Sequence, residues 1–399
     1  MLSKATPLMK RSVSSIINGS WNLTPDQQAI QEAALKFSKS EISPYANEWD
    51  EKGYFPRDVI KKSADLGFGG LYCKPDFGGI GCNRLEASLV FEALATGCVG
   101  TTAYMTVHNM CAWVLDTFGS IEQRKRWLPE LFRYERFASY CLTEPQSGSD
   151  AASLKTVAKL EGNYFIINGS KMFITGGDAS DLYLVMCRTG PKEISCIAVE
   201  SPTQGLSFGR REAKLGWNSH PTQLVSFDNV KVPKENLIGG QGTGFKIAMQ
   251  ALDGGRINIS SCALGGAWFA LAQAQNYMQE RMQFGKRLVD HQYLRFKMAE
   301  ALTKLTGSRI MVRHAADMLD QHNPAKITMG SMAKLFSTDN CFDVANMALQ
   351  MHGGYGVMRS YGVERAFRDL RILQIVEGTN EIMRLVIARE MFKDQDVQG

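Results

Sequence analysis

The segment 375–384 places Glu377 at a small-residue break between two apolar helical runs. Burying an unpaired carboxylate is costly, so Glu377 is poor material for a hydrophobic core. A carboxylate held at such a place can act as a general base, with its surroundings setting its pKa. The alternative is an ordinary acid in a loop between two helices. We interpret Glu377 as a candidate catalytic base.

Two further segments have residue types that suit a flat polar ligand. The segment 140–150 leaves a predicted strand and enters a turn rich in hydroxyls and small residues. Its backbone N–H groups and hydroxyls can bind a polar heterocycle or a phosphate, although an ordinary Ser/Gly loop has the same composition. Phe173 and Thr175 are alternate strand residues and point to one face, which suits stacking and hydrogen bonding to a ring. Core packing explains Phe173 equally well.

The C-terminal half contains two more candidate positions. The segment 253–256 places two glycines inside a helical pattern, where glycine lowers helix stability. We therefore infer that another group approaches the backbone closely there. Residues 379–381 open the last helix, whose N-terminal dipole favours a nearby negative group.

The elements that must position these residues fall into three regions. Thr24, Pro25 and Gln27 predict a helix start with a capping box, and helical patterns continue to about residue 135. Short β-branched and aromatic runs between 137 and about 232 predict a small antiparallel β domain. After the glycine-rich segment 239–244, long helical patterns predict a four-helix bundle.

Particular elements are predicted more closely. Asn168-Gly169 between two apolar runs predicts a β-hairpin. Further strands are predicted over 181–188, 194–200 and 222–227. In the last region the helical patterns cover 245–283, 291–321 and 325–351.

Composition excludes several classes of protein. The net charge is +5, and Lys4, Lys10 and Arg11 supply three of these positive charges. The remaining net charge of about +2 does not predict a nucleic-acid-binding surface. No apolar run reaches about 18 residues, so we do not expect a transmembrane helix. The nine cysteines and six histidines show no disulfide framework or metal spacing. No glycine-rich dinucleotide or triphosphate motif and no serine-hydrolase elbow is present.

Residues 1–20 have the composition of a targeting sequence. They contain Lys, Arg and Ser with apolar residues and no acid. That composition suits a mitochondrial presequence better than a secretory signal, with an unstructured tail as the alternative. The expected division is a presequence at 1–20, a helical domain at 24–136, a β domain at 137–240 and a helical bundle at 241–399.

The motifs in this order resemble the acyl-CoA dehydrogenase family over roughly residues 24–392. The segment 375–384 resembles the catalytic-base segment of that family, and 140–150 matches its L-T-E-P-x-x-G-S-D signature. The resemblance implies an α+β fold with an N-terminal helical domain, a middle antiparallel β domain and a C-terminal four-helix bundle. Gly255 stands where a minority of members carry their catalytic glutamate, which strengthens Glu377. Phe173 stands where many members have tryptophan.

The resemblance also implies a residue set for FAD and acyl-CoA. The FAD contacts within a subunit would be Tyr140, Leu142, Thr143, Ser149, Phe173, Ile174, Thr175, Thr379, Asn380 and Glu381. Contacts reaching the FAD of a neighbouring subunit would be Arg281, Phe284, His291, Gln292, Gln350, Gly353 and Gly354. The acyl-CoA side would comprise Ser149, Asp253, Gly254, Arg256, Gly378 and Arg389. Taken alone, Arg281 and Arg389 also fit a solvated helix surface.

The implied reaction is α,β-dehydrogenation of an acyl-CoA. Glu377 would take the α-proton, FAD would take the β-hydrogen as hydride, and hydrogen-bond donors would stabilise the thioester oxygen. Electrons would pass to electron-transferring flavoprotein, and the enzyme would be a homotetramer of the mitochondrial matrix. We expect conversion of isobutyryl-CoA to methacrylyl-CoA in valine catabolism. Chains differing by one methylene are poorly discriminated, so 2-methylbutyryl and short straight-chain thioesters remain open.

Three other functions are compatible with the same scaffold. An acyl-CoA oxidase would use the same base but is usually longer. A flavin monooxygenase would not need Glu377. A non-enzymatic scaffold protein of this family would not need intact site motifs.

Overall fold

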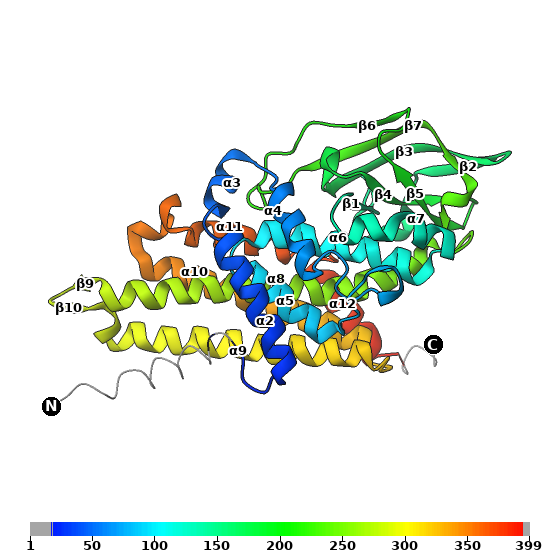
Figure 1. The fold of residues 1–399 in the computed structure, drawn as a ribbon. Helices are drawn as coiled ribbons and strands as arrows, with labels where there is room; N and C mark the ends of the chain where they lie inside the picture. The colour runs from blue at the N-terminus through cyan, green and yellow to red at the C-terminus, as the bar shows by residue number, and fades with distance from the viewer. Residues whose placement is uncertain (1–16, 18, 394–399) are drawn as a thin grey trace. The chain divides into compact units, whose positions relative to one another are not determined.

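A computed structural model describes residues 17 and 19–393 as two compact units (Figure 1). Within the described residues, unit 1 comprises 17, 19–47, Arg84–Thr102 and 256–393, and unit 2 comprises Glu48–Asn83 and Ala103–Gly255. Three helices contain residues of both units: α3 (Ala46–Lys52), α6 (Val99–Phe118) and α8 (Gly244–Glu280). Each unit is described by itself below.

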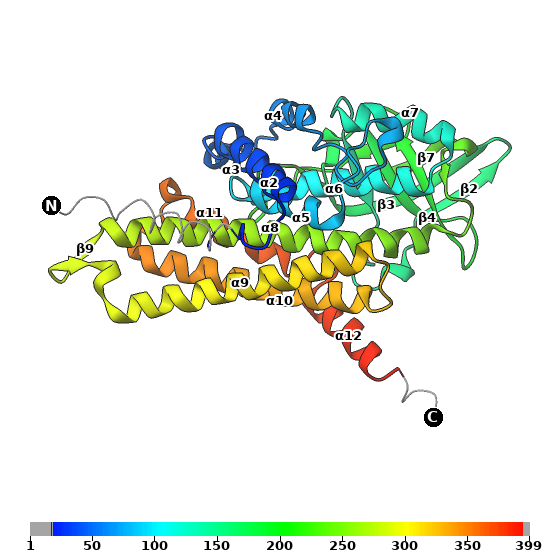
Figure 2. The same cartoon turned by 60° about the horizontal axis from the view of Figure 1, so that its bottom comes forward.

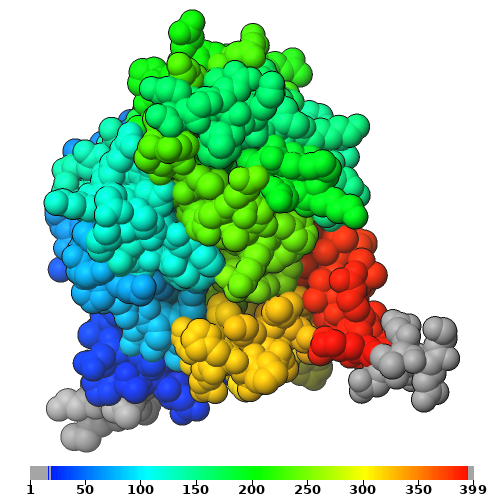
Figure 3. Space-filling model, turned by 90° about the vertical axis from the view of Figure 1, so that its right-hand side faces the viewer, coloured from blue at the N-terminus to red at the C-terminus, as the bar shows by residue number. Residues whose placement is uncertain are grey.

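Unit 1 is helical. Besides most of α8 it contains α2 (Pro25–Phe37), α5 (Arg84–Ala95), α9 (Gln292–Asp320), α10 (Lys326–His352), α11 (Val363–Leu373) and α12 (Asn380–Met391). The long helices α8, α9 and α10 run side by side in both ribbon views (Figures 1 and 2), and α10 also packs against α11 and α12. The helix α12 and the end of the α9–α10 pair lie on neighbouring parts of the surface in Figure 3. This helical arrangement confirms the fold predicted for the C-terminal region.

The first helix begins where the sequence predicts. The Gln27 backbone N–H donates to Thr24 Oγ1 at 3.2 Å, and the Thr24 N–H donates to Gln27 Oε1 at 3.1 Å. These two bonds satisfy donors that a helix start leaves without partners. The predicted capping box is therefore confirmed.

Part of the expected presequence is packed into unit 1. Ile17 is buried, and its carbonyl accepts a hydrogen bond of 2.9 Å from Arg309 Nη2. Arg309 is itself buried and pairs with Glu92 at 2.6 Å. Gly19 has a φ of +64°, and a Cβ there would collide with the Arg309 side chain. Residues 1–16 and 18 lie outside the described residues, so the presequence itself stays a prediction.

Unit 2 is a β-sheet with helices. Its strands are β1 (Ala138–Cys141), β2 (Val157–Glu161), β3 (Tyr164–Thr175), β4 (Leu182–Arg188), β5 (Ile194–Glu200), β6 (Leu206–Phe208), β7 (Thr222–Pro233) and β8 (Leu237–Ile238). The order is β6-β7-β3-β2-β4-β5-β8, with β1 beside β4. Most neighbours are antiparallel, as predicted, but β1 and one bridge of β2 pair with β4 in parallel. Unit 2 also contains α4 (Arg57–Lys62) and α7 (Ile121–Phe132).

Apolar side chains cover both faces of this sheet. On one face, strand residues such as Leu184 and Ala198 pack with Leu115 of α6, Leu128 of α7 and Ala248 of α8. Buried side chains of the other face form a second cluster, including residues from β3, β4, β5 and β7. Alternation along the strands thus supplies two apolar layers.

The hairpin predicted at Asn168-Gly169 is wrong. The strand β3 continues through both residues, and the hairpin turn instead lies at 162–163, between β2 and β3. Asn168 and Gly169 form an irregularity in the pairing with β7, where the Asn229 N–H donates to Asn168 Oδ1 at 2.9 Å. A cross-strand partner therefore accommodates the Asn-Gly pair as a bulge.

Two exclusions drawn from composition can be compared with the structure. Among residues 17 and 19–393, no helix is both long and apolar enough to cross a membrane. Within that same part of the chain, no group of three metal-ligating His, Cys, Asp or Glu side chains occurs. The nine cysteines are free thiols.

Candidate active site

Glu377 lies in the short connection between α11 and α12 of unit 1. The helix α11 ends at Leu373 and α12 begins at Asn380, with Thr379 capping it through a bond from the Ile382 N–H to Thr379 Oγ1 at 3.3 Å. Glu377 has a φ of +57°, in the left-handed region. A residue with a Cβ is disfavoured there by about 1–2 kcal/mol, so the surrounding structure must hold it. The predicted break between two helices is confirmed.

The Glu377 carboxyl group is strongly perturbed by its surroundings. The residue as a whole is half-buried, but its Oε2 is buried and has no hydrogen-bond partner among the described residues. Burial raises the pKa of Glu377 from its usual value to about 7, while the positive charges of Arg256 and Lys334 oppose that rise. A carboxyl with such a pKa is poised to exchange a proton near neutral pH.

Three of the predicted site residues lie on α12. Asn380 is buried, and its Nδ2 donates to Asp339 Oδ1 at 2.7 Å and to Thr338 Oγ1 at 3.0 Å. This side chain therefore binds α12 to α10. Glu381 and Arg389 are exposed on α12.

The segment 253–256 is part of α8, as predicted. Arg256 is buried, and its Nη1 donates to Ser331 Oγ of α10 at 3.4 Å. Its charge acts on Glu377 within unit 1. Asp253 is half-buried and Gly254 is buried, both in the portion of α8 that belongs to unit 2. Gly378, beside the base, has a φ of +89°, and a Cβ there would lie 2.7 Å from Met383 Cε.

Unit 2 brings the segment 140–150 next to the end of β3. The Met172 N–H donates to the Thr143 carbonyl at 2.8 Å, which joins the two predicted segments. Phe173 is 62% exposed and has a φ of +59°, at an irregularity of the β3–β7 pairing. Tyr140, Thr143 and Thr175 are half-buried. An exposed ring and partly accessible polar groups therefore lie together near the C-terminal end of β3.

Other predicted members of this group contribute differently. Leu142 and Ile174 are buried within apolar clusters, so their side chains serve packing. Ser149 is exposed in the loop that follows.

A buried ion pair that the sequence analysis missed supports this loop. Lys171 Nζ donates to Glu144 Oε1 at 2.8 Å and to the Leu142 carbonyl at 3.0 Å. Glu144 also accepts from the backbone N–H groups of Lys155 at 2.6 Å and Thr156 at 2.9 Å. Burial tends to raise the pKa of Glu144, but its bonds to Lys171 and Thr156 lower it to about 2. The ion pair thus keeps the loop against β3.

A third group of residues lies at one end of the bundle in unit 1. The strands β9 (Met282–Gln283) and β10 (Lys286–Arg287) form a small hairpin after α8. A cavity of about 600 Å³ lies beside it, lined by Arg281 and by Gln350, Gly353 and Gly354 from the end of α10. Arg281 lies 5.6 Å from the centre of the Tyr355 ring. The structure therefore brings two distant predicted segments into one cavity.

The remaining residues predicted for this end surround the hairpin. Phe284 forms its tip and is 92% exposed, and His291 Nε2 donates to the Gln283 carbonyl at 3.2 Å. Gln292 is exposed at the start of α9. These residues lie close to Arg281 in the chain but do not line the cavity.

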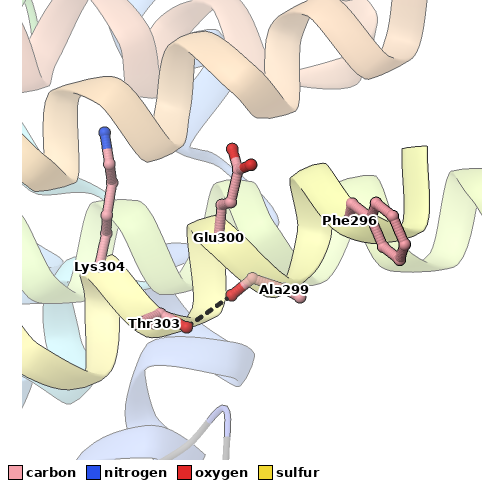
Figure 4. A pocket seen from close by; sticks show the side chains of 5 residues that line it. All are labelled: Phe296, Ala299, Glu300, Thr303 and Lys304. Atoms are coloured by element: carbon pink, nitrogen blue, oxygen red, sulfur yellow. Dashed lines mark hydrogen bonds between the residues drawn. The ribbon is translucent and has the colours of Figure 1, made fainter. Parts of the chain in front are cut away.

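A separate groove of about 530 Å³ lies along α9 and contains none of the predicted site residues (Figure 4). Its lining consists of Phe296, Ala299, Glu300, Thr303 and Lys304. The Thr303 hydroxyl donates back to the Ala299 carbonyl at 2.8 Å, and Lys304 pairs with Asp343 of α10 at 2.6 Å. The polar groups of this groove thus have partners within the bundle.

Comparison with known proteins assigns the family. Residues 24–135, 139–230 and 242–392 match the N-terminal, middle and C-terminal domains of acyl-CoA dehydrogenases. The chain belongs to the acyl-CoA dehydrogenase family. It is therefore an oxidoreductase of a flavoprotein family, and the family and fold implied by the sequence motifs are confirmed.

Individual family members are similar over nearly their whole length. The chain is 52% identical over 388 residues to a mitochondrial isobutyryl-CoA dehydrogenase of Bos taurus, covering 96% of this chain and 93% of the relative. It is 51% identical over 401 residues to the corresponding protein of Dictyostelium discoideum, covering 99% and 96%. Among solved structures, butyryl-CoA dehydrogenase from Megasphaera elsdenii superposes with a TM-score of 0.90 at 35% identity, covering 93% of this chain and 99% of that one.

Proposed function

We propose that this enzyme oxidises isobutyryl-CoA to methacrylyl-CoA, the reaction of valine catabolism, with Glu377 as the base and FAD as the acceptor. The reaction class follows from the family. The substrate is supported by two relatives named isobutyryl-CoA dehydrogenase, each about half identical to this chain. The observation that supports the base is its buried, unpartnered carboxylate oxygen beside two cations.

Glu377 removes the proton from the carbon next to the thioester carbonyl. That proton is weakly acidic, so the step needs a base of raised pKa and a donor at the carbonyl oxygen. Burial supplies the raised pKa. Within the described chain, the Glu377 backbone N–H has no hydrogen-bond acceptor and is free to donate to the thioester oxygen. Exclusion of water by the bound substrate strengthens both interactions.

The residues fit an FAD in two places. In unit 2, Phe173 offers an exposed ring beside the loop that contains Thr143, which suits the flat isoalloxazine. In unit 1, the cavity at the bundle end combines the Arg281 guanidinium with Gly353 and Gly354, where an added Cβ would meet nothing within 4 Å. A forked cation and open backbone suit the diphosphate of a dinucleotide. When bound, FAD accepts the β-hydrogen of the substrate as a hydride.

The remaining predicted residues belong to the acyl-CoA side or to the contact between subunits. Ser149, Asp253, Gly254, Arg256, Gly378 and Arg389 stay predictions for the acyl-CoA side. The bundle-end cavity would bind the FAD of a neighbouring subunit, which requires at least a dimer and fits a homotetramer. Exposed Phe296, Ile310 and Leu385 of α9 and α12 supply apolar surface for such association.

The cellular setting follows from the relatives. Both are mitochondrial by name, and the composition of residues 1–20 suits a matrix presequence. Members of the family pass their electrons to electron-transferring flavoprotein, which we propose as the partner here.

The direct test is anaerobic reduction of the bound flavin by a panel of short acyl-CoAs, followed as loss of its visible absorbance. The proposal predicts faster reduction by isobutyryl-CoA than by 2-methylbutyryl-CoA or butyryl-CoA. Faster reduction by another thioester would replace the substrate but keep the reaction. A bound flavin that no thioester reduces would reject the proposed activity.

A further inference from the structure

Lys334 is a buried cation placed directly behind the base segment. Its side chain is inaccessible to solvent, on the face of α10 that packs against α12. Lys334 Nζ donates to the Gly378 carbonyl at 2.8 Å and to Asn380 Oδ1 at 2.8 Å. An ammonium group is expensive to bury unless its donors are used. Lys334 uses two of its donors on Gly378 and Asn380, which follow Glu377 in the chain.

These bonds act on a strained part of the backbone. Glu377 and Gly378 have φ values of +57° and +89°, which the surrounding structure must maintain. The Asn380 N–H donates to the Gln374 carbonyl at 3.0 Å and closes the connection across its base. Among the described residues, one side chain from another element hydrogen-bonds the backbone of residues 375–379, and it is that of Lys334 on α10. It therefore fixes the Gly378–Thr379 peptide, one residue after the base.

Asn380 extends the same support toward α10. Its Oδ1 accepts from Lys334 and its Nδ2 donates to Asp339 Oδ1, which also accepts from Gln374 Nε2 at 2.8 Å. One helix thus anchors both sides of the connection, through Gln374 before the base and Asn380 after it. A connection held at both ends has little freedom to redirect the Glu377 carboxyl.

Charged groups from three helices face this place. Arg256 of α8 and Lys334 of α10 are buried and act directly on Glu377. Asp339 of α10, with 43% side-chain exposure, pairs with Arg384 at 3.4 Å. Glu381 and Arg384 of α12 are exposed, with side-chain exposures of 81% and 55%. The outer charges are screened by solvent, so the two buried cations dominate.

Burial also keeps the charge of Lys334 adjustable. Burial lowers the pKa of Lys334 to about 7, with opposition from Glu377 and Asp339, and Arg256 lowers it further. A cation that titrates in the same range as the base couples to it electrostatically.

We propose that Lys334 is a positioning residue for the base: its ammonium holds the Glu377–Gly378 connection and favours the ionised carboxylate. This inference rests on Glu377 being the base. Loss of the ammonium would release the Gly378 carbonyl and remove a nearby positive charge. Both changes slow proton removal without touching the flavin-side residues of unit 2.

The test compares Lys334→Met with Lys334→Gln, which retains an amide donor but no charge. Arg384→Met is the matched control, because it removes one positive charge from the same region without contacting the Glu377–Gly378 backbone. The measurement is the rate of anaerobic flavin reduction by isobutyryl-CoA between about pH 6 and 9, together with flavin content and melting temperature. A role in folding alone would leave the pH profile unchanged.

The acid limb of the profile should move up by about one pH unit in Lys334→Met, because an opposing cation is lost. The rate near neutral pH should fall about tenfold, with flavin still bound. Lys334→Gln should shift the limb equally but lose less rate at its plateau, and Arg384→Met should match the native enzyme. An unmoved limb and native rate in both lysine variants would overturn the proposal.

Two further outcomes are also decisive. If both lysine variants fail to fold with flavin, Lys334 is part of the fold and the positioning role is rejected. If Glu377→Gln keeps native activity, the base assignment fails first, and the lysine proposal fails with it. If Glu377→Gln is inactive while both lysine variants behave like the native enzyme, only the proposed role of Lys334 is rejected.

Discussion

Replacing Glu377 by glutamine should stabilise the protein at alkaline pH. Burial raises the Glu377 pKa from 4.5 to about 7, so the folded protein holds an unfavourable carboxylate above that pH. Because the folded pKa is raised, the stability contribution is complete below about pH 4.5 and is lost as the pH rises to 7. A shift of this size corresponds to at most about 3 kcal/mol. Glutamine has a similar shape but no charge to bury.

The melting temperature of the substrate-free holoenzyme is a suitable readout. For a chain of this length, about 3 kcal/mol corresponds to a difference of about 3–4 °C. Glu377→Gln should therefore melt higher than the native enzyme near pH 8, and the difference should vanish near pH 4. The pKa of about 7 already includes the opposing charges of Arg256 and Lys334. Because Glu377 as a whole is only half-buried, solvent screens its charge and about 3 kcal/mol is an upper bound.

The matched control is Glu390→Gln, on the exposed face of α12, the helix that follows Glu377 in the chain. Glu390 pairs with Lys393 at 3.5 Å at the surface, and such pairs contribute little. Its melting difference should be small at both pH values. A Glu377→Gln difference that is independent of pH, or a destabilisation at pH 8, would refute the reasoning about burial.

Three further outcomes are expected. Lys171→Met should lower the free energy of unfolding by about 3–5 kcal/mol, because it leaves the Glu144 carboxylate buried without its cation. Chemical denaturation, followed together with flavin release, would measure this loss, and a native denaturation midpoint would contradict it. Arg281→Ala should weaken FAD retention without lowering the melting temperature of the flavin-free protein, as dialysis followed by fluorescence would show, and unchanged retention would count against the cavity. Removing residues 1–22 should lower the melting temperature relative to removing 1–16, because the longer deletion takes away the Ile17 carbonyl that Arg309 binds; equal melting would show that this contact contributes nothing.

Local patterns in the sequence predicted the elements well where the interactions are local. The capping box at Thr24 and the strand Ile194–Glu200 are found as predicted, because neighbouring residues determine them. Asn168-Gly169 misled because a bulge and a hairpin turn use the same residue types. Whether the Asn168-Gly169 pair forms a turn or a bulge depends on Asn229, some sixty residues away in the chain. Register with a distant strand is not visible in a short window.

The candidate site was predictable to different depths. Glu377 was visible because an acid at a helix break is unusual, and the structure adds its burial and its backbone conformation. Lys334 was not visible, since a lysine within a helical pattern is typical of a solvated face. Its burial is a product of α10 packing against α12. Asn380 was expected near a ligand, which stays a prediction, and the structure adds that its side chain hydrogen-bonds α10.

The most direct test of the central claim is the rate of flavin reduction by isobutyryl-CoA in Glu377→Gln under anaerobic conditions. The account predicts that the variant keeps its flavin, folds and binds the thioester, while reduction slows about a thousandfold or more, as expected for loss of a general base. Reduction at the native rate by a folded, flavin-containing variant would contradict it and remove Glu377 from its role.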